Sequence, residues 1–125
     1  MSNKEVDISV YKFKIDDIPK SLNHYAGRAN SWEYREDKKN WTALVYYNCI
    51  GKRPKNPITK ALVTITYFFP TQSRRDPDNY SGKMIMDGLV TAGVLEDDSF
   101  GCIELRLRGE YDKVEPRTEI VVEVM

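Results

Sequence analysis

Residues 60–70 of the chain read KALVTITYFFP, a run in which β-branched and aromatic side chains recur at every second position. Because side chains along a strand point alternately to two faces, this run predicts a strand with one face packed inward. It is the strongest strand signal in the sequence, and we expect the sheet to be built around it. The inward set would be Val63, Ile65, Tyr67 and Phe69.

Three other stretches alternate apolar and polar residues and predict further strands, at residues 6–15, 102–109 and 118–125. The alternation of the first slips at Tyr11–Lys12, which leaves a bulge or an early end of the strand open. The stretch between the last two strands, residues 112–116, is expected to be the turn that joins them.

Helical periodicity occurs twice. Asn30 is a plausible N-cap for a helix that runs to about Cys49. A second helix is expected from Tyr80 or Ser81 to Ala92, ended by Gly93 as its C-cap. Its buried stripe would be Ile85, Leu89 and Ala92, and that of the first helix Trp41, Leu44, Val45 and Cys49.

The expected element order is therefore β-α-β-α-β-β, with residues 16–29, 51–57 and 71–79 as loops. We predict an α+β fold in which a small mixed β-sheet carries its helices on one face. At 125 residues the chain is expected to form a single domain, residues 1–125.

Composition excludes several classes of protein. With 41% hydrophobic and 30% charged residues the chain is not expected to be disordered, and it has no apolar run of the roughly 18 residues that a membrane span needs. The first ten residues carry no export signal. Cys49 and Cys102 have no metal-ligand spacing, so we expect two reduced thiols and a cytoplasmic location.

Charge is distributed unevenly along the chain although the formal net charge is zero. Residues 20–60 carry nine basic and three acidic side chains, whereas residues 84–125 carry four basic and ten acidic ones. Folding that interleaves these charges over the surface is one explanation. A basic face for nucleic acid beside an acidic metal site is the other.

The chemistry is concentrated in residues 74–80, RRDPDNY, and in Asp97–Asp98. In an extended backbone Asp76 and Asp78 would point to the same side, about 6–7 Å apart. Pro77 favours an extended Asp76. Clustered carboxylates need a cation to offset their repulsion, and oxygen ligands favour Mg²⁺ or Mn²⁺. Turn formation and helix capping are the alternative roles for these residues.

The run RRDPDNYSGKMIMDGLVTAGVLEDDS, residues 74–99, resembles the signature of the RusA family of Holliday junction resolvases. Residues 19–25, PKSLNHY, resemble the early segment of the same family. The resemblance implies that Asp76, Asp78 and Asp98 are catalytic, metal-binding aspartates. Asp97 is the neighbouring carboxylate of that set.

Lys83 matches the catalytic lysine of the family in its spacing to Asp87, four residues later. It lies one residue further from Asp78 than in the family pattern, which indicates one inserted residue within 80–82. Asp87 is expected to support the site rather than to bind metal. The resemblance further implies a homodimer that uses Mg²⁺ to cut two symmetric strands of a four-way DNA junction. Many family members are encoded by phages or prophages.

Basic residues are the expected contacts to the DNA backbone, since neutralising phosphates is the dominant source of DNA affinity. The alternative for those outside the motif is ordinary solvated charge. The candidate set is Arg74, Arg75, Lys38, Lys39, Lys52, Arg53 and Lys55.

The sequence thus predicts a metal-dependent endodeoxyribonuclease that resolves branched DNA. Asp76, Asp78 and Asp98 would hold the cation, and Lys83 or a nearby arginine would stabilise the developing charge. A protein that binds branched DNA without cutting it is one alternative. A nuclease for other branched DNA, such as flaps and forks, is the other.

Overall fold

Strand β2 (Ala61–Phe69) is central in the sheet of this computed structural model, which describes residues 9–26 and 31–125. It pairs antiparallel with β4 (Arg117–Val124) on one side and parallel with β3 (Ile103–Tyr111) on the other. β1 (Val10–Ile15) pairs antiparallel with the outer side of β4. The described sheet is therefore mixed, with the order β1-β4-β2-β3.

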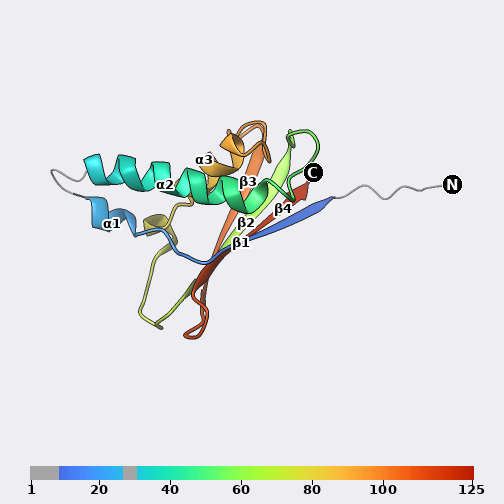
Figure 1. Ribbon diagram of the computed structural model, residues 1–125. Coiled ribbons are helices and arrows are strands. Elements are labelled where there is room, and N and C mark those ends of the chain that lie inside the picture. The colour runs from blue at the N-terminus through green and yellow to red at the C-terminus, as the bar shows by residue number, and fades with distance from the viewer. Residues whose placement is uncertain (1–8, 27–30) are drawn as a thin grey trace.

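The two longer helices, α2 (Ser31–Cys49) and α3 (Lys83–Thr91), lie over one face of this sheet, as Figure 1 shows. The expected α+β class and the order of the main elements are confirmed. Two short helical turns, α1 (Leu22–Tyr25) and η1 (Pro77–Asn79), occur in segments expected to be loops. None of the helices in the described ranges has the length and apolar character that crossing a membrane requires.

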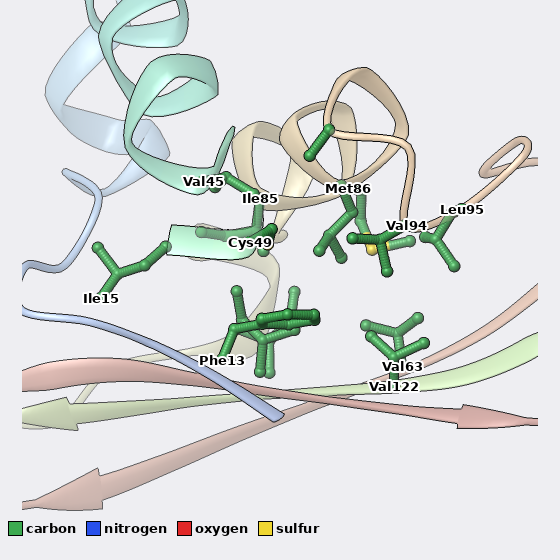
Figure 2. Packing of buried hydrophobic residues seen from close by; sticks show 14 of the residues in the cluster. Phe13, Ile15, Val45, Cys49, Val63, Ile85, Met86, Val94, Leu95 and Val122 are labelled. Atoms are coloured by element: carbon green, nitrogen blue, oxygen red, sulfur yellow. The ribbon is translucent and has the colours of Figure 1, made fainter. Parts of the chain in front are cut away.

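The inward face of β2 is buried as predicted: Val63 and Ile65 have no exposed surface, and Tyr67 and Phe69 are nearly covered. Figure 2 shows how side chains of the sheet and helices meet in this core. Strands β1 and β4 contribute a second set of buried side chains, which consists of Phe13, Ile15, Ile120 and Val122.

The bulge or early end that the sequence left open at Tyr11–Lys12 does not occur in the described strand, because β1 pairs with β4 without interruption from Val10 to Ile15. Its inward residues are the odd-numbered ones, so Val10 points to the other side of the sheet and is 41% exposed. The first part of the predicted strand, residues 6–8, lies outside the described residues.

Helix α2 buries Trp41, Val45 and Cys49, which lie four residues apart and therefore on one stripe. Leu44 was wrongly placed in that stripe. It precedes Val45 by one residue, about 100° around the helix, and is 36% exposed. The proposed N-cap, Asn30, lies outside the described residues.

Helix α3 begins at Lys83, two to three residues later than predicted. The delay follows from η1, whose last turn closes with Tyr80 N–H donating to the carbonyl of Pro77, and from the left-handed backbone of Gly82. Ile85, Leu89 and Ala92 are fully buried as predicted. Gly93, with φ 81°, ends the helix region as expected.

The two long helices pack most tightly at Gly88 of α3, opposite Val45 of α2. A Cβ placed on Gly88 would lie 2.6 Å from Cβ of Val45, closer than two carbon atoms can pack. The absence of a side chain at Gly88 is therefore what allows α3 to approach α2 at this distance.

We expect Gly88→Ala to lower the free energy of unfolding by about 1–3 kcal/mol, because overpacking outweighs the better helix propensity of alanine. Adding Val45→Ala should recover part of this loss, so that the double variant is more stable than the sum of the single effects predicts. Urea denaturation measures all three. Gly51→Ala, with no atom near its Cβ, is the control. Strictly additive effects would contradict the contact.

The two cysteines are free thiols in different environments. Cys49 has no exposed surface, and its burial raises the pKa of the thiol from 9.0 to about 12, although Lys52 and Arg53 oppose the rise. Cys102 is half-buried. Since the unfolded Cys49 ionises at lower pH than the folded one, this residue favours unfolding progressively as pH rises above about 9.

At pH 8 the folded protein should therefore react with one equivalent of a thiol reagent, at Cys102. Cys49 should react only after unfolding, because its raised pKa lowers the thiolate fraction about a thousandfold. Titration with a chromogenic disulfide, with and without urea, measures this. Two fast equivalents in the native protein would contradict the packing of Cys49.

Candidate functional site

The first two aspartates follow the loop that leaves the end of β2. Asp76 has extended backbone, with φ −107° and ψ 139°, as predicted for a residue before proline. Asp78, in contrast, lies inside the helical turn η1 that Pro77 begins. The expectation that one extended stretch would align Asp76 with Asp78 was therefore wrong, because the proline that extends its predecessor also starts a turn.

Asp76 lies beside the second half of β3, where it lines a small pocket with Leu107 and Gly109. Arg74 is its ion-pair partner, with Nε 3.3 Å from the carboxylate. Both side chains are largely exposed, so the pair contributes little to stability and leaves the carboxylate accessible.

Asp97 and Asp98 lie at the other end of β3, in the turn that leads into it. A carboxylate oxygen of Asp97 accepts a hydrogen bond from the backbone N–H of Asp98, at 2.9 Å. Asp98 borders an open hollow with Ile103 and Leu105, on the side of the sheet that the helices cover. Phe100, in the same turn, is fully exposed.

A single chain does not assemble the predicted metal site. Asp76 lies next to residues 107–109 and Asp98 next to residues 103–105, and these two stretches are about four residues, or about 13 Å, apart along the strand. Among the residues that the structure describes, no three side chains of His, Cys, Asp or Glu are placed to share a metal ion. In this arrangement Asp76 and Asp98 of one chain are too far apart to share one cation.

Lys83 and Asp87 do meet, as their spacing on α3 predicts. The carboxylate of Asp87 lies 3.5 Å from Nζ of Lys83 and 3.2 Å from Nζ of Lys38, which reaches it from α2. The oxygen that faces both ammonium groups is buried and has no well-aligned hydrogen bond in the described structure. Asp87 thus pairs with Lys83 on its own helix, and Lys38 links α2 to α3 through the same carboxylate.

The segment that resembles the early family motif, residues 19–25, is joined to the acidic motif by a hydrogen bond. The side-chain oxygen of Asn79 accepts it from the backbone N–H of Asn23, at 2.8 Å. Sequence reasoning missed this role of Asn79, for which its place beside Asp78 in a turn was the only signal. The two stretches on which the resemblance rests are therefore neighbours in space.

The same segment is held against α2 by charged side chains. Nζ of Lys20 lies 2.8 Å from Glu33 and 2.9 Å from Asp37, and the hydroxyl of Tyr25 donates to Asp37 at 2.7 Å. His24 also contacts Glu33, at 2.8 Å. The hydrogen bonds from Lys20 and His24 hold the pKa of Glu33 below its usual range. This network, unforeseen from sequence, fixes one wall of the site.

The other predicted DNA contacts fall into two groups. Arg53 donates to the carbonyl of Ala92 at 2.9 Å, so part of its bonding capacity serves the fold. Arg75 lies over the ring of Phe69. The remaining three side chains are exposed, one in the middle of α2 and two in the loop after it: Lys39, Lys52 and Lys55.

Comparison of the sequence with models of protein families gives no match, and a search of curated proteins gives none either. The resemblance to resolvases therefore rests on the motif residues of the sequence alone.

Proposed function

We propose that this protein is a cytoplasmic metal-dependent endodeoxyribonuclease that acts as a homodimer on branched DNA, with the four-way junction as its substrate. The observation that carries the proposal is the position of the aspartates along β3. Asp76 and Asp98 lie on the same side of the sheet and at opposite ends of the same edge strand. A second chain on that edge would bring the two ends together.

The outer edge of β3 has no partner strand in the described sheet. At the two ends of β3, backbone groups point toward the neighbouring strand β2. The carbonyl of Cys102 accepts a hydrogen bond from the N–H of Ala61, and the N–H of Asp112 donates one to the carbonyl of Phe69. Because backbone groups of successive residues alternate between the two sides of a strand, those of Ile103, Leu105 and Leu107 point outward. Phe100 and Leu105 expose apolar surface along this edge, so covering it with a second copy is favourable.

Charge favours an antiparallel pairing of β3 with its copy about a two-fold axis at Leu105. In this pairing Glu104 of each chain lies opposite Arg106 of the partner subunit, which gives two oppositely charged pairs. Leu105 lies opposite Leu105 of the partner subunit. Centring the axis on Arg106 would set that residue against itself. Centring it on Leu107 would oppose Glu104 with the partner's Glu110 and Arg106 with the partner's Arg108.

In the Leu105 register, residues 107–109 of one chain lie opposite residues 103–101 of the other. In this pairing the partner's Asp98 would come next to Asp76, and Asp78 in the adjoining turn would be the third carboxylate around one position. A divalent cation bound there would supply an activated water and charge for the scissile phosphate. Lys83, positioned by Asp87, is the cationic side chain that this chain offers to the developing charge.

The first test is cleavage of a labelled four-way junction in Mg²⁺ and in EDTA, with linear duplex, flap and fork DNA as controls. We expect paired symmetric nicks that require the metal. Asp78→Asn should lose cutting and keep junction binding, because it removes a metal ligand and some repulsion from phosphate.

Tight junction binding without cutting in Mg²⁺ or Mn²⁺ would contradict the nuclease and favour a protein that only binds branched DNA. Preferential cutting of flaps or forks would keep the nuclease and change its substrate. Loss of both binding and cutting in Asp78→Asn would indicate a folding defect, which circular dichroism of the variant detects.

A second test mixes two inactive variants, Asp76→Asn and Asp98→Asn, after unfolding and refolding them together. If each site combines Asp76 of one chain with Asp98 of the other, half of the sites in a mixed dimer are intact. We therefore expect single nicks to return, at up to about half of the dimers by random pairing, whereas each variant alone stays inactive. A site within one chain would give no recovery.

A structural control does not depend on activity. In a Cys102→Ser background, Leu105→Cys should form a disulfide dimer on mild oxidation, since paired residues at the axis lie about 5.5 Å apart between Cα atoms. Arg106→Cys is the matched control, because its copies lie too far apart in this register. Cross-linking of Arg106→Cys instead would overturn the register.

A further inference from the structure

A second concave surface lies at the end of the sheet next to Asp76. The loop after β2 and the hairpin between β3 and β4 project from the same end of the sheet in Figure 1. Between them is an open hollow of about 330 Å³. Its lining combines aromatic rings with polar side chains of the loop, and it shares Phe69, Arg75 and Gly109 with the small pocket that contains Asp76.

The guanidinium group of Arg75 lies over the ring of Phe69 at the wall of this hollow. Its central carbon lies 4.2 Å from the centroid of the Phe69 ring. One terminal nitrogen donates to the carbonyls of Thr71 and Ser73, at 3.1 and 3.0 Å, and the other donates to the hydroxyl of Thr71, at 2.8 Å. Three of the five N–H groups of Arg75 are thus used within the loop, which fixes the plane of the group.

Arg117 shows what a purely structural arginine looks like in the same fold. It lies 3.8 Å from the ring centroid of Phe68, on the opposite face of the sheet. Two carboxylates, of Asp112 and Glu119, neutralise it at 2.7 Å each. Arg75, in contrast, has no carboxylate partner among the described residues, and its side chain borders open space. Its charge and its plane therefore remain available to a ligand.

Gly109 keeps the hollow open. It lies in β3 opposite Tyr67, on the face that carries the core, so a side chain there would point into the hollow. A Cβ on Gly109 would lie 3.5 Å from the ring of Phe69, an ordinary contact, which shows that alanine fits while a larger side chain would fill the space. Tyr111, 46% exposed, borders the hollow at the end of the strand.

We propose that this hollow binds one unpaired nucleobase of a DNA substrate, stacked on the plane of Arg75 and bordered by Tyr111. Unstacked bases are recognised by aromatic rings and by guanidinium planes, and a base seated here would place its phosphate next to Asp76. The proposal rests on the proposed action on branched DNA, whose crossover nucleotides are the most easily unpaired. It assigns Arg75 to a base instead of to the phosphate that the sequence suggested.

The test measures binding in EDTA, so that it does not depend on cutting. One crossover nucleotide of the junction at a time is replaced by an abasic residue, which keeps the phosphate and removes the base. At one position the loss should weaken binding by the wild-type protein about fivefold or more, the lower range for a stacked base. A 2-aminopurine at that position, and in a short oligothymidylate, should change its fluorescence on binding.

Three variants distinguish stacking of a nucleobase from a contact between phosphate and the charge of Arg75. Gly109→Leu should abolish the fluorescence change and the abasic effect, whereas Gly109→Ala should retain both. Arg75→Lys keeps the charge and loses the plane, so it should also lose both. If Arg75→Lys retains them, or if no abasic position matters, Arg75 contacts phosphate and the proposal is overturned.

The two proposals fail in different ways. If the wild-type protein cuts junctions but no abasic replacement weakens binding, the nuclease stands and the base site does not. If it cuts no junction yet changes the fluorescence of 2-aminopurine in the oligothymidylate, and Gly109→Leu abolishes that change, the base site stands and the nuclease does not.

Discussion

The arrangement of this protein depends on one constraint, the parallel pairing of β2 with β3. Two parallel neighbours require a crossover that returns the chain from the end of one strand to the start of the next. Here residues 70–102 form that crossover, and α3 is its helix. Every aspartate of the predicted site lies in it, two before α3 and two after. The crossover therefore separates Asp76 from Asp98 by much of the length of β3.

Tight packing makes this crossover rigid enough to position side chains. Gly88 lets α3 lie against Val45 of α2, and Asp87 on the same helix holds Lys83 and Lys38 together. Because Leu89 and Ile85 are fully buried beneath them, the helix has little freedom to rotate. The backbone position of Lys83 is accordingly set by the packing of α3 and not only by its place in a motif. The edge of β3 is the part left uncovered, and the proposed dimer uses that edge.

Local sequence patterns correctly predicted which side chains are buried wherever a single periodicity decides burial. The alternation in residues 60–70 identified all four inward residues of β2, and the stripe of α3 was equally clear, because burying the opposite face would expose several large side chains at once. Errors arose where two rules compete at adjacent positions. Leu44 is as apolar as its buried neighbour Val45 but points away, and Pro77 extends Asp76 while it turns Asp78.

The sequence by itself determined the α+β class, the order of the elements, the inward residues of the central strand and the pairing of Lys83 with Asp87, since each depends on spacings of two to four residues. Only the tertiary structure decided that Asp76 and Asp98 lie near opposite ends of an edge strand, that Asn79 accepts a hydrogen bond from Asn23, and that Arg75 lies over the ring of Phe69 beside an open hollow. These relations join residues separated by six to 56 positions. Strand register and crossover geometry set them, and a local sequence pattern contains neither.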